Sequence, residues 1–179
     1  MPLNVIIAID LSGSMSGRPM NMARNAAMEF VSKIDLNIHC VGIMGFADRS
    51  KMFSNLTHEI SSIESAINKL DCNASRVGYG NDNNPLGDAI DIFKYKEDSK
   101  NILIVLTDGV WSSQKQAIKS SDYCREVGYE VVAIGFGSAD KKFLERISTN
   151  IENALMTNLD NLVDSFGSIA QEISQSGGA

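Results

Sequence analysis

An aspartate and two serines at alternate positions follow the first apolar run of the chain. The run covers residues 5–9, and Asp10, Ser12 and Ser14 come directly after it. A tight turn of the backbone would aim the oxygen atoms of these three side chains at one point. Oxygen ligands on such a turn suit a hard cation, Mg²⁺ first and Ca²⁺ or Mn²⁺ as alternatives. One interpretation of the segment is therefore a divalent metal site.

A second interpretation of the same segment is a simple strand-to-helix turn. Gly13 and Gly17 would permit a tight turn in either case, because glycine adopts backbone conformations that other residues avoid. Ser14 or Ser16 could then cap the following helix, since serine is favoured at that position. The segment 9–17 by itself leaves both interpretations open.

The composition of the 179 residues is that of one globular domain with a full core. Hydrophobic residues make up 44% and charged residues 21%. The formal net charge of -6 argues against a nucleic-acid-binding surface, which is normally basic. A membrane helix needs roughly twenty apolar residues, and the longest apolar runs here have about five. We therefore expect neither nucleic-acid binding nor a membrane span.

The cysteines are odd in number and widely spaced. Cys40, Cys72 and Cys124 form no Cys-x-x-Cys motif, so a cysteine zinc site is not expected. One thiol would remain unpaired in any disulfide scheme, and no secretory signal precedes the first apolar run. These features predict a cytoplasmic protein with free thiols.

Apolar periodicity predicts strands that alternate with helices along the whole chain. Strands are expected at 5–9, 37–46, 51–55, 102–106, 131–136 and 153–157, and helices at 18–34, 60–70, 85–93, 114–127, 141–148 and 159–173. The segment 72–84 is the main irregular stretch, and such loops tend to be functional or mobile. The predicted fold is a single α/β domain over residues 1–176, followed by a frayed tail at 177–179. Its Rossmann-like, doubly wound sheet is mostly parallel, with one short antiparallel edge strand and helices on both faces.

A second acidic turn lies at the end of another buried strand. The apolar run 102–106 ends in Thr107-Asp108-Gly109, as the first run ends in Asp10. Ligands of doubly wound sheets bind beyond the carboxyl ends of the strands. If the two strands are neighbours, both aspartates lie above one crevice, which favours the metal site over a simple helix cap.

These motifs together resemble the von Willebrand factor A (vWA) family. That family carries a metal-ion-dependent adhesion site (MIDAS), which consists of D-x-S-x-S, a loop threonine and an aspartate after a later strand. The resemblance covers about residues 3–174 in the order and length of the elements. It implies a vWA fold in which Ser12 and Ser14 coordinate Mg²⁺, or Ca²⁺ or Mn²⁺, directly. By the same resemblance, Asp10 and Asp108 bind the ion directly or through water.

The loop threonine of the family is replaced in this chain. The family pattern T-P-L-G aligns with Asn84 and the three residues after it. An asparagine carbonyl is an adequate ligand for Mg²⁺ or Ca²⁺, so Asn84 is the fifth expected metal ligand. Asp82 or Asn83 takes that role if the alignment is off by a residue or two.

The expected ligands are too few to fill the coordination shell of the cation. The resemblance implies that an Asp or Glu carboxylate of a partner protein completes it, and the positive end of the helix starting near Arg18 would favour that anion. The chain is therefore expected to be a non-enzymatic protein-binding module. Its similarity to small stand-alone bacterial vWA proteins implies an adaptor in a stress or phosphorylation-linked system.

Two alternative functions remain open. A haloacid-dehalogenase-like, Mg²⁺-dependent phosphatase would use Asp10 as nucleophile and Thr107 beside it, although Ser12 replaces the second acid of the usual D-x-D. A vWA domain that binds partners without metal is the other alternative, which the replacement at Asn84 allows. Trp111, the single tryptophan, is either an exposed contact residue beside the crevice or a packed core residue.

Overall fold

β1 (Leu3–Asp10) and β4 (Lys100–Thr107) are adjacent parallel strands at the centre of one sheet. The computed structural model describes residues 1–177, which form a six-stranded sheet in the order β3-β2-β1-β4-β5-β6. The other strands are β2 (Cys40–Phe46), β3 (Ser50–Thr57), β5 (Glu130–Gly135) and β6 (Ala154–Met156). Every pairing is parallel except that of β3 with β2, so the predicted antiparallel edge strand is confirmed.

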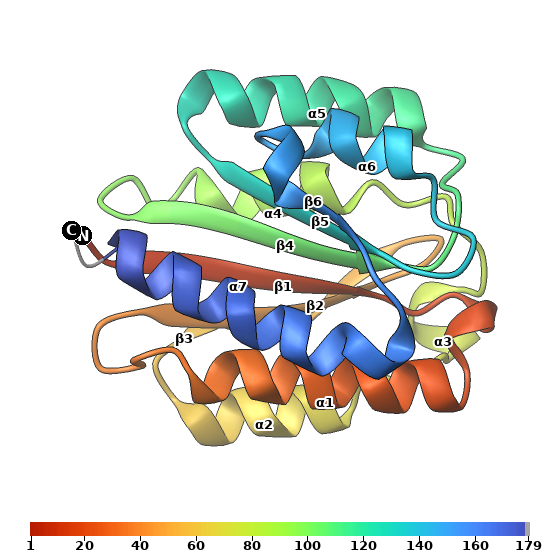
Figure 1. Cartoon of the computed structure of the whole chain (residues 1–179), viewed down its shortest axis with the longest axis horizontal. Coiled ribbons are helices and arrows are strands. Elements are labelled where there is room, and N and C mark those ends of the chain that lie inside the picture. The colour runs from red at the N-terminus through yellow and green to blue at the C-terminus, as the bar shows by residue number, and fades with distance from the viewer. Residues whose placement is uncertain (178–179) are drawn as a thin grey trace.

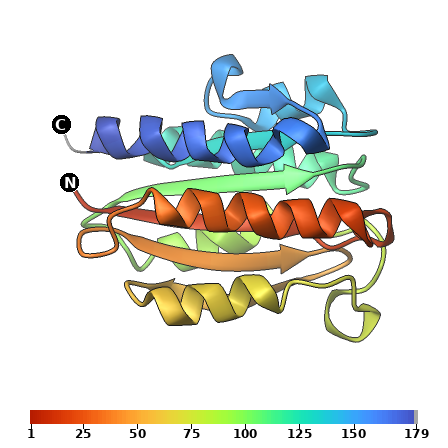
Figure 2. The same cartoon turned by 60° about the horizontal axis from the view of Figure 1, so that its bottom comes forward.

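Helices cover both faces of this sheet, as predicted (Figure 1). They are α1 (Arg18–Ser32), α2 (Ile60–Asn68), α3 (Ala74–Val77), α4 (Pro85–Phe93), α5 (Gln114–Val127), α6 (Lys141–Ile147) and α7 (Leu162–Gly177). Short 3₁₀ turns are η1 (Gly13–Met15), η2 (Ile151–Asn153) and η3 (Leu159–Asn161). Figure 2 shows α1 and α7 side by side over one face of the sheet.

Alternate residues of β1 belong to two different hydrophobic cores. Val5 and Ile7 pack with α1, α2 and α7, whereas Ile6 and Ala8 pack with α4, α5 and α6. All four side chains are fully buried. A central strand covered on both faces must be apolar at every position, which is why the sequence shows continuous apolar runs here instead of alternation.

The predicted elements differ from the observed ones mainly at their ends and in the irregular stretch. The segment predicted as loop, 72–84, contains the short helix α3. The last predicted helix begins with η3 before α7 proper. α7 extends to Gly177, and residues 178 and 179 of the predicted tail lie outside the described part of the chain.

The carboxyl ends of β1 and β4 lie at the end of the molecule opposite to both termini (Figure 1). After β1 the chain adds β2 on one side, and later β4 on the other, so the order of strands reverses at β1. In open α/β sheets a ligand crevice forms at such a reversal. Among residues 1–177, no helix has the length and apolar character needed to cross a membrane.

Candidate metal site

The two acidic turns meet at the carboxyl end of the sheet. Asp10 is the last residue of β1 and has no exposed surface, and Asp108, directly after β4, is 9% exposed. The Ser14 hydroxyl donates a hydrogen bond to Asp108 Oδ1 over 3.0 Å and so connects turns that are 94 residues apart. The predicted convergence of Asp10 and Asp108 on one crevice therefore occurs, because β1 and β4 are hydrogen-bonded neighbours.

The turn after β1 places its side-chain oxygen atoms close together. Asp10 Oδ1 accepts a hydrogen bond from the Ser12 amide over 2.8 Å. The hydroxyl oxygens of Ser12 and Ser14 lie 3.3 Å apart. Four of the five predicted ligands, Asp10, Ser12, Ser14 and Asp108, thus form one connected cluster.

Only one of the two glycines in this turn adopts a conformation that favours glycine. Gly17 has φ +82°, whereas Gly13 lies in η1 and is not among the glycines with positive φ. Gly17 is also the N-cap residue of α1. The alternative in which Ser14 or Ser16 caps that helix is therefore wrong.

Thr107 and Trp111 fix the second oxygen of Asp10. The Thr107 hydroxyl donates to Asp10 Oδ2 over 2.7 Å and accepts a hydrogen bond from Trp111 Nε1 over 3.0 Å. The Trp111 side chain is buried, with its ring edge-to-face against Phe46 and Phe143. Trp111 is thus a packed residue that orients the site and not an exposed contact residue. The threonine directly before Asp108 was the sequence signal for this support.

The cluster carries two carboxylates that no cationic side chain neutralises. Burial raises the pKa of Asp10, hydrogen bonds from Ser12 and Thr107 oppose this rise, and the nearby charge of Asp108 adds to it. Within residues 1–177 no ion pair involves either aspartate. A divalent cation would favour the charged form of both, and all available donors are carboxylate or hydroxyl oxygens. The residues present therefore fit a hard cation.

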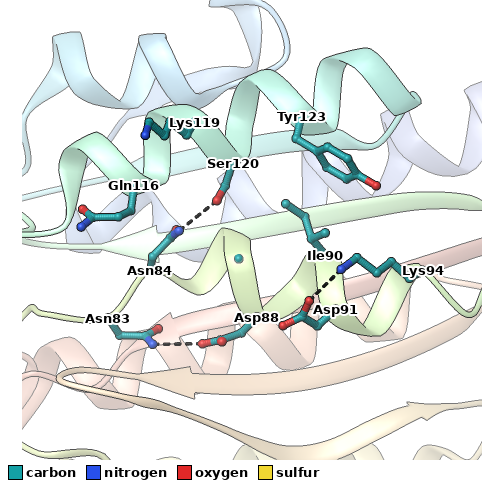
Figure 3. A pocket seen from close by; sticks show the side chains of 11 residues that line it. Asn83, Asn84, Asp88, Ile90, Asp91, Lys94, Gln116, Lys119, Ser120 and Tyr123 are labelled. Carbon is teal, nitrogen blue, oxygen red and sulfur yellow. Dashed lines mark hydrogen bonds and ion pairs between the residues drawn. The ribbon is translucent and has the colours of Figure 1, made fainter.

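Among residues 1–177, no hydrogen bond links Asn84 to this cluster. Figure 3 shows its side chain directed toward α5, where its amide nitrogen donates to the Ser120 hydroxyl over 2.9 Å. Asn83 and Asp82, the other candidates for the loop ligand, are hydrogen-bonded elsewhere as well. Asn83 donates to Asp88 over 3.0 Å, and Asp82 accepts from Ser112 over 2.6 Å. Asn84 is the N-cap residue of α4, and in this structure its side chain lies on the α5 side of that helix end.

A cavity opens directly beside the cluster. It has a volume of about 560 Å³, and its lining includes Ser14, Asp108, Arg18 and Asp160. Arg18 forms an ion pair with Asp160 over 2.6 Å, and both side chains are largely exposed. α1 begins at Arg18, and Arg18 and Pro19 of its first turn both line the cavity, so its positive helix end lies at this region. The cavity is large enough to admit a side chain from another protein.

The family model of the von Willebrand factor type A domain matches residues 4–172. The chain is 27% identical over 173 residues to the collagen alpha-5(VI) chain of Homo sapiens, which covers 92% of this chain and 7% of that protein. It is 23% identical over 184 residues to an uncharacterized protein of Synechocystis sp., covering 99% of this chain and 43% of that one. The chain thus spans less than half the length of these curated relatives.

Solved structures show the same fold. The vWF domain of the type V pili tip protein Mfa5 from Porphyromonas gingivalis has a TM-score of 0.81 at 13% identity, with 98% of this chain and 96% of that chain covered. Proximal thread matrix protein 1 from the mussel byssus, with a zinc-occupied MIDAS motif, has a TM-score of 0.78 at 21% identity. That match covers 96% of this chain and 46% of the other.

Proposed function

The chain belongs to the von Willebrand factor type A family, and on this basis we propose that it is a non-enzymatic protein-binding module. Its site captures an Asp or Glu side chain of a partner protein through a divalent cation, Mg²⁺ with Ca²⁺ or Mn²⁺ as alternatives. The cation is held at the carboxyl ends of β1 and β4. The residues that hold it are Asp10, Ser12, Ser14 and Asp108.

The hydrogen bond between Ser14 and Asp108 carries this proposal. It brings oxygen donors from two distant turns together beside two carboxylates that form no ion pair within residues 1–177. Ser14 and Asp108 also line the cavity, whereas Asp10 and Ser12 are buried beneath it. A bound divalent cation would supply positive charge and a coordination position open to an external carboxylate. Arg18 at the cavity rim would attract the same anion.

Isothermal titration calorimetry on metal-stripped protein tests the metal site. We expect uptake of one divalent ion, and we expect Asp10→Ala to abolish it. Asp91→Ala is the matched control, because Asp91 is an exposed carboxylate on α4 that pairs with Lys94. Absence of uptake of magnesium, manganese and calcium at millimolar concentrations would refute the proposal.

Peptide binding tests the capture of an acidic side chain. Matched peptide sets with a single Glu or a single Gln at the same position are titrated in Mg²⁺ and in EDTA. We expect binding only for Glu peptides and only in Mg²⁺. Binding that persists in EDTA would instead support the alternative of a vWA domain that works without metal.

The phosphatase alternative is disfavoured by the environment of Asp10. A nucleophilic aspartate must reach its substrate, but the Asp10 side chain is fully buried and both of its oxygens accept hydrogen bonds. We therefore expect no Mg²⁺-dependent hydrolysis of p-nitrophenyl phosphate above the buffer rate. Robust hydrolysis that is lost in Asp10→Asn would overturn this part of the proposal.

The adaptor role is proposed from the family resemblance alone, and the cytoplasmic location from the odd number and wide spacing of the cysteines. We propose a cytoplasmic adaptor in a bacterial stress or phosphorylation-linked system. Fractionation of the source cells tests the location, and recovery of the chain outside the cytoplasm contradicts it.

A further inference from the structure

We propose that Asn81, rather than Asn84, supplies the metal ligand that the family takes from its loop threonine. The inference rests on the proposed metal site and identifies one of its ligands. The family alignment places the loop ligand at Asn84, but the amide nitrogen of that side chain donates to Ser120 and holds the side chain toward α5 (Figure 3). Another residue of the same loop therefore has to be considered for the role.

Buried side-chain oxygens without a hydrogen-bond partner mark the asparagine-rich loop. Asn81 Oδ1, Asn83 Oδ1 and Asn84 Oδ1 are three of the four such side-chain atoms among the described residues. A buried acceptor that is left unpaired destabilises a fold, so each one calls for an explanation such as an ion or a bound water. The loop thus contains three oxygens that could take a cation.

Asn81 Oδ1 lies beside the turn that carries Asp108. A side chain at Gly109 would place its Cβ 3.8 Å from Asn81 Oδ1, so the Asn81 amide packs directly against the residue after Asp108. The Asn84 amide nitrogen lies instead 3.2 Å from the corresponding position at Gly87, on α4.

The backbone holds residues 79–81 between the two metal-site turns. The Tyr79 carbonyl accepts a hydrogen bond from the Gly13 amide over 3.0 Å, on the side of β1. The Asn81 carbonyl accepts one from the Ser112 amide over 3.1 Å, on the side of β4. The loop therefore spans the crevice, and Asn81 lies at its β4 side.

Asp48 holds this loop in place through contacts with residues 78–80. Its carboxylate accepts a hydrogen bond from the Tyr79 amide over 3.3 Å. A Cβ at Gly78 or Gly80 would lie only 2.2 or 2.3 Å from this carboxylate, so only glycine allows so close an approach. The loop is thus clamped against the site by interactions that do not involve a metal.

The chemistry of Asn81 suits the role. An amide carbonyl is a neutral, hard oxygen ligand, as a threonine hydroxyl is. It adds no negative charge beyond that of the two carboxylates, so an acidic partner would meet no further repulsion from the site. Asn81 would therefore replace the family threonine without changing the charge of the site.

Metal affinity of single variants tests the assignment. We expect Asn81→Ala to raise the Kd for Mg²⁺, and for Mn²⁺ as a second probe, at least about tenfold in calorimetry. Asn81→Asp keeps an oxygen at the position and should bind at least as tightly as the wild type. Asn83→Ala and Asn84→Ala are the matched controls and should stay within about twofold of the wild type.

Thermal unfolding adds a readout that does not depend on the calorimeter. In EDTA we expect Asn81→Ala to melt no lower than the wild type, because the change removes an unpaired buried acceptor. In Mg²⁺ the same variant should melt lower than the wild type, since it gains less from the ion. A purely structural role for Asn81 would lower the melting temperature in both conditions.

The outcomes separate this inference from the proposed function. If the wild type takes up no metal, both are refuted. If the wild type binds metal and Asn81→Ala binds equally well, the assignment to Asn81 is wrong and the metal site stands. Loss of affinity in Asn84→Ala alone would return the role to the position that the family alignment indicates.

Discussion

Asp10 is a fully buried carboxylate whose partners are all neutral donors. The Ser12 amide and the Thr107 hydroxyl each donate to one of its oxygens. Such bonds compensate only part of the free energy lost when a charge leaves water. At the scale of the residue, the site is therefore electrostatically incomplete without a cation.

The pH dependence of stability reports this incompleteness. Burial raises the pKa of Asp10 above its ordinary value of 3.8. The folded state thus binds a proton more readily than the unfolded chain, and this contribution to stability is lost as pH rises through the raised pKa. For metal-free protein, we expect the unfolding free energy of the wild type relative to Asp10→Asn to increase as pH falls. This difference in unfolding free energy should level off below pH 3.8, the ordinary pKa of an aspartate. Urea titrations at a series of pH values measure it. If the unfolding free energy of the wild type relative to Asp10→Asn instead decreased on acidification, the raised pKa of Asp10 would be contradicted.

The Thr107 hydroxyl supports the site through its hydrogen bonds to Asp10 and Trp111. Thr107→Val keeps the shape but leaves Asp10 Oδ2 and Trp111 Nε1 buried without this partner. We expect a loss of about 1–3 kcal/mol in unfolding free energy, measured by urea denaturation, together with weaker metal uptake. Thr157→Val is the control, because its hydroxyl has only a 3.4 Å contact to Ser165, and it should change stability little.

At the scale of elements, β2 sets the path of the turn after β1. The Leu11 amide donates to the Phe46 carbonyl over 2.7 Å, and the Leu11 side chain packs over Gly45. A Cβ at Gly45 would lie 2.4 Å from Leu11 Cδ1 and 2.7 Å from the Phe53 ring. Leu11 lies between Asp10 and Ser12 in the chain. Because Gly45 has no side chain, the turn after β1 can pack closely against β2.

A pair of glycine variants tests this packing. Gly45→Ala should lower the unfolding free energy by about 1–3 kcal/mol, because Leu11 and Phe53 must move, and should also weaken Mg²⁺ uptake. Gly13→Ala is the control, since the nearest atom to its Cβ position, on Tyr79, is 4.0 Å away. Denaturation and calorimetry of both variants measure the effects. An equal loss in the two variants would show that any side chain in this region disturbs the site.

At the scale of the whole molecule, the proposed metal site couples ion binding to folding. The proposed ligands come from the end of β1, the turn after it and the residue after β4. The unfolded chain therefore has no formed site, and the ion would stabilise only the native state. At a free Mg²⁺ concentration of 100 times Kd, we expect about 2.7 kcal/mol of added stability. For a domain of this size the melting temperature should then rise by about 5–10 °C over that in EDTA. Asp10→Ala should show no such rise, and a rise of equal size in that variant would place the ion elsewhere.

The sequence alone predicted the α/β fold, the antiparallel edge strand and the turn after β1. Buried parallel strands must be apolar throughout, and the period of apolar residues changes where helices begin, so both are visible without coordinates. The sequence does not predict α3, because residues 74–77 show no apolar period. The sequence does not decide the packing of Trp111, because a single aromatic residue carries no directional signal.

The sequence by itself identified which residues could bind a metal, and the tertiary structure decided which of them lie close together. The motifs indicated Asp10, Ser12, Ser14 and Asp108 as ligands because acidic and hydroxyl residues follow the predicted strands there. Contacts between distant segments then turned Asn84 toward Ser120 and placed Asn81 beside Gly109. A loop side chain points where its neighbours from other elements allow, and those neighbours are known only once the chain has folded.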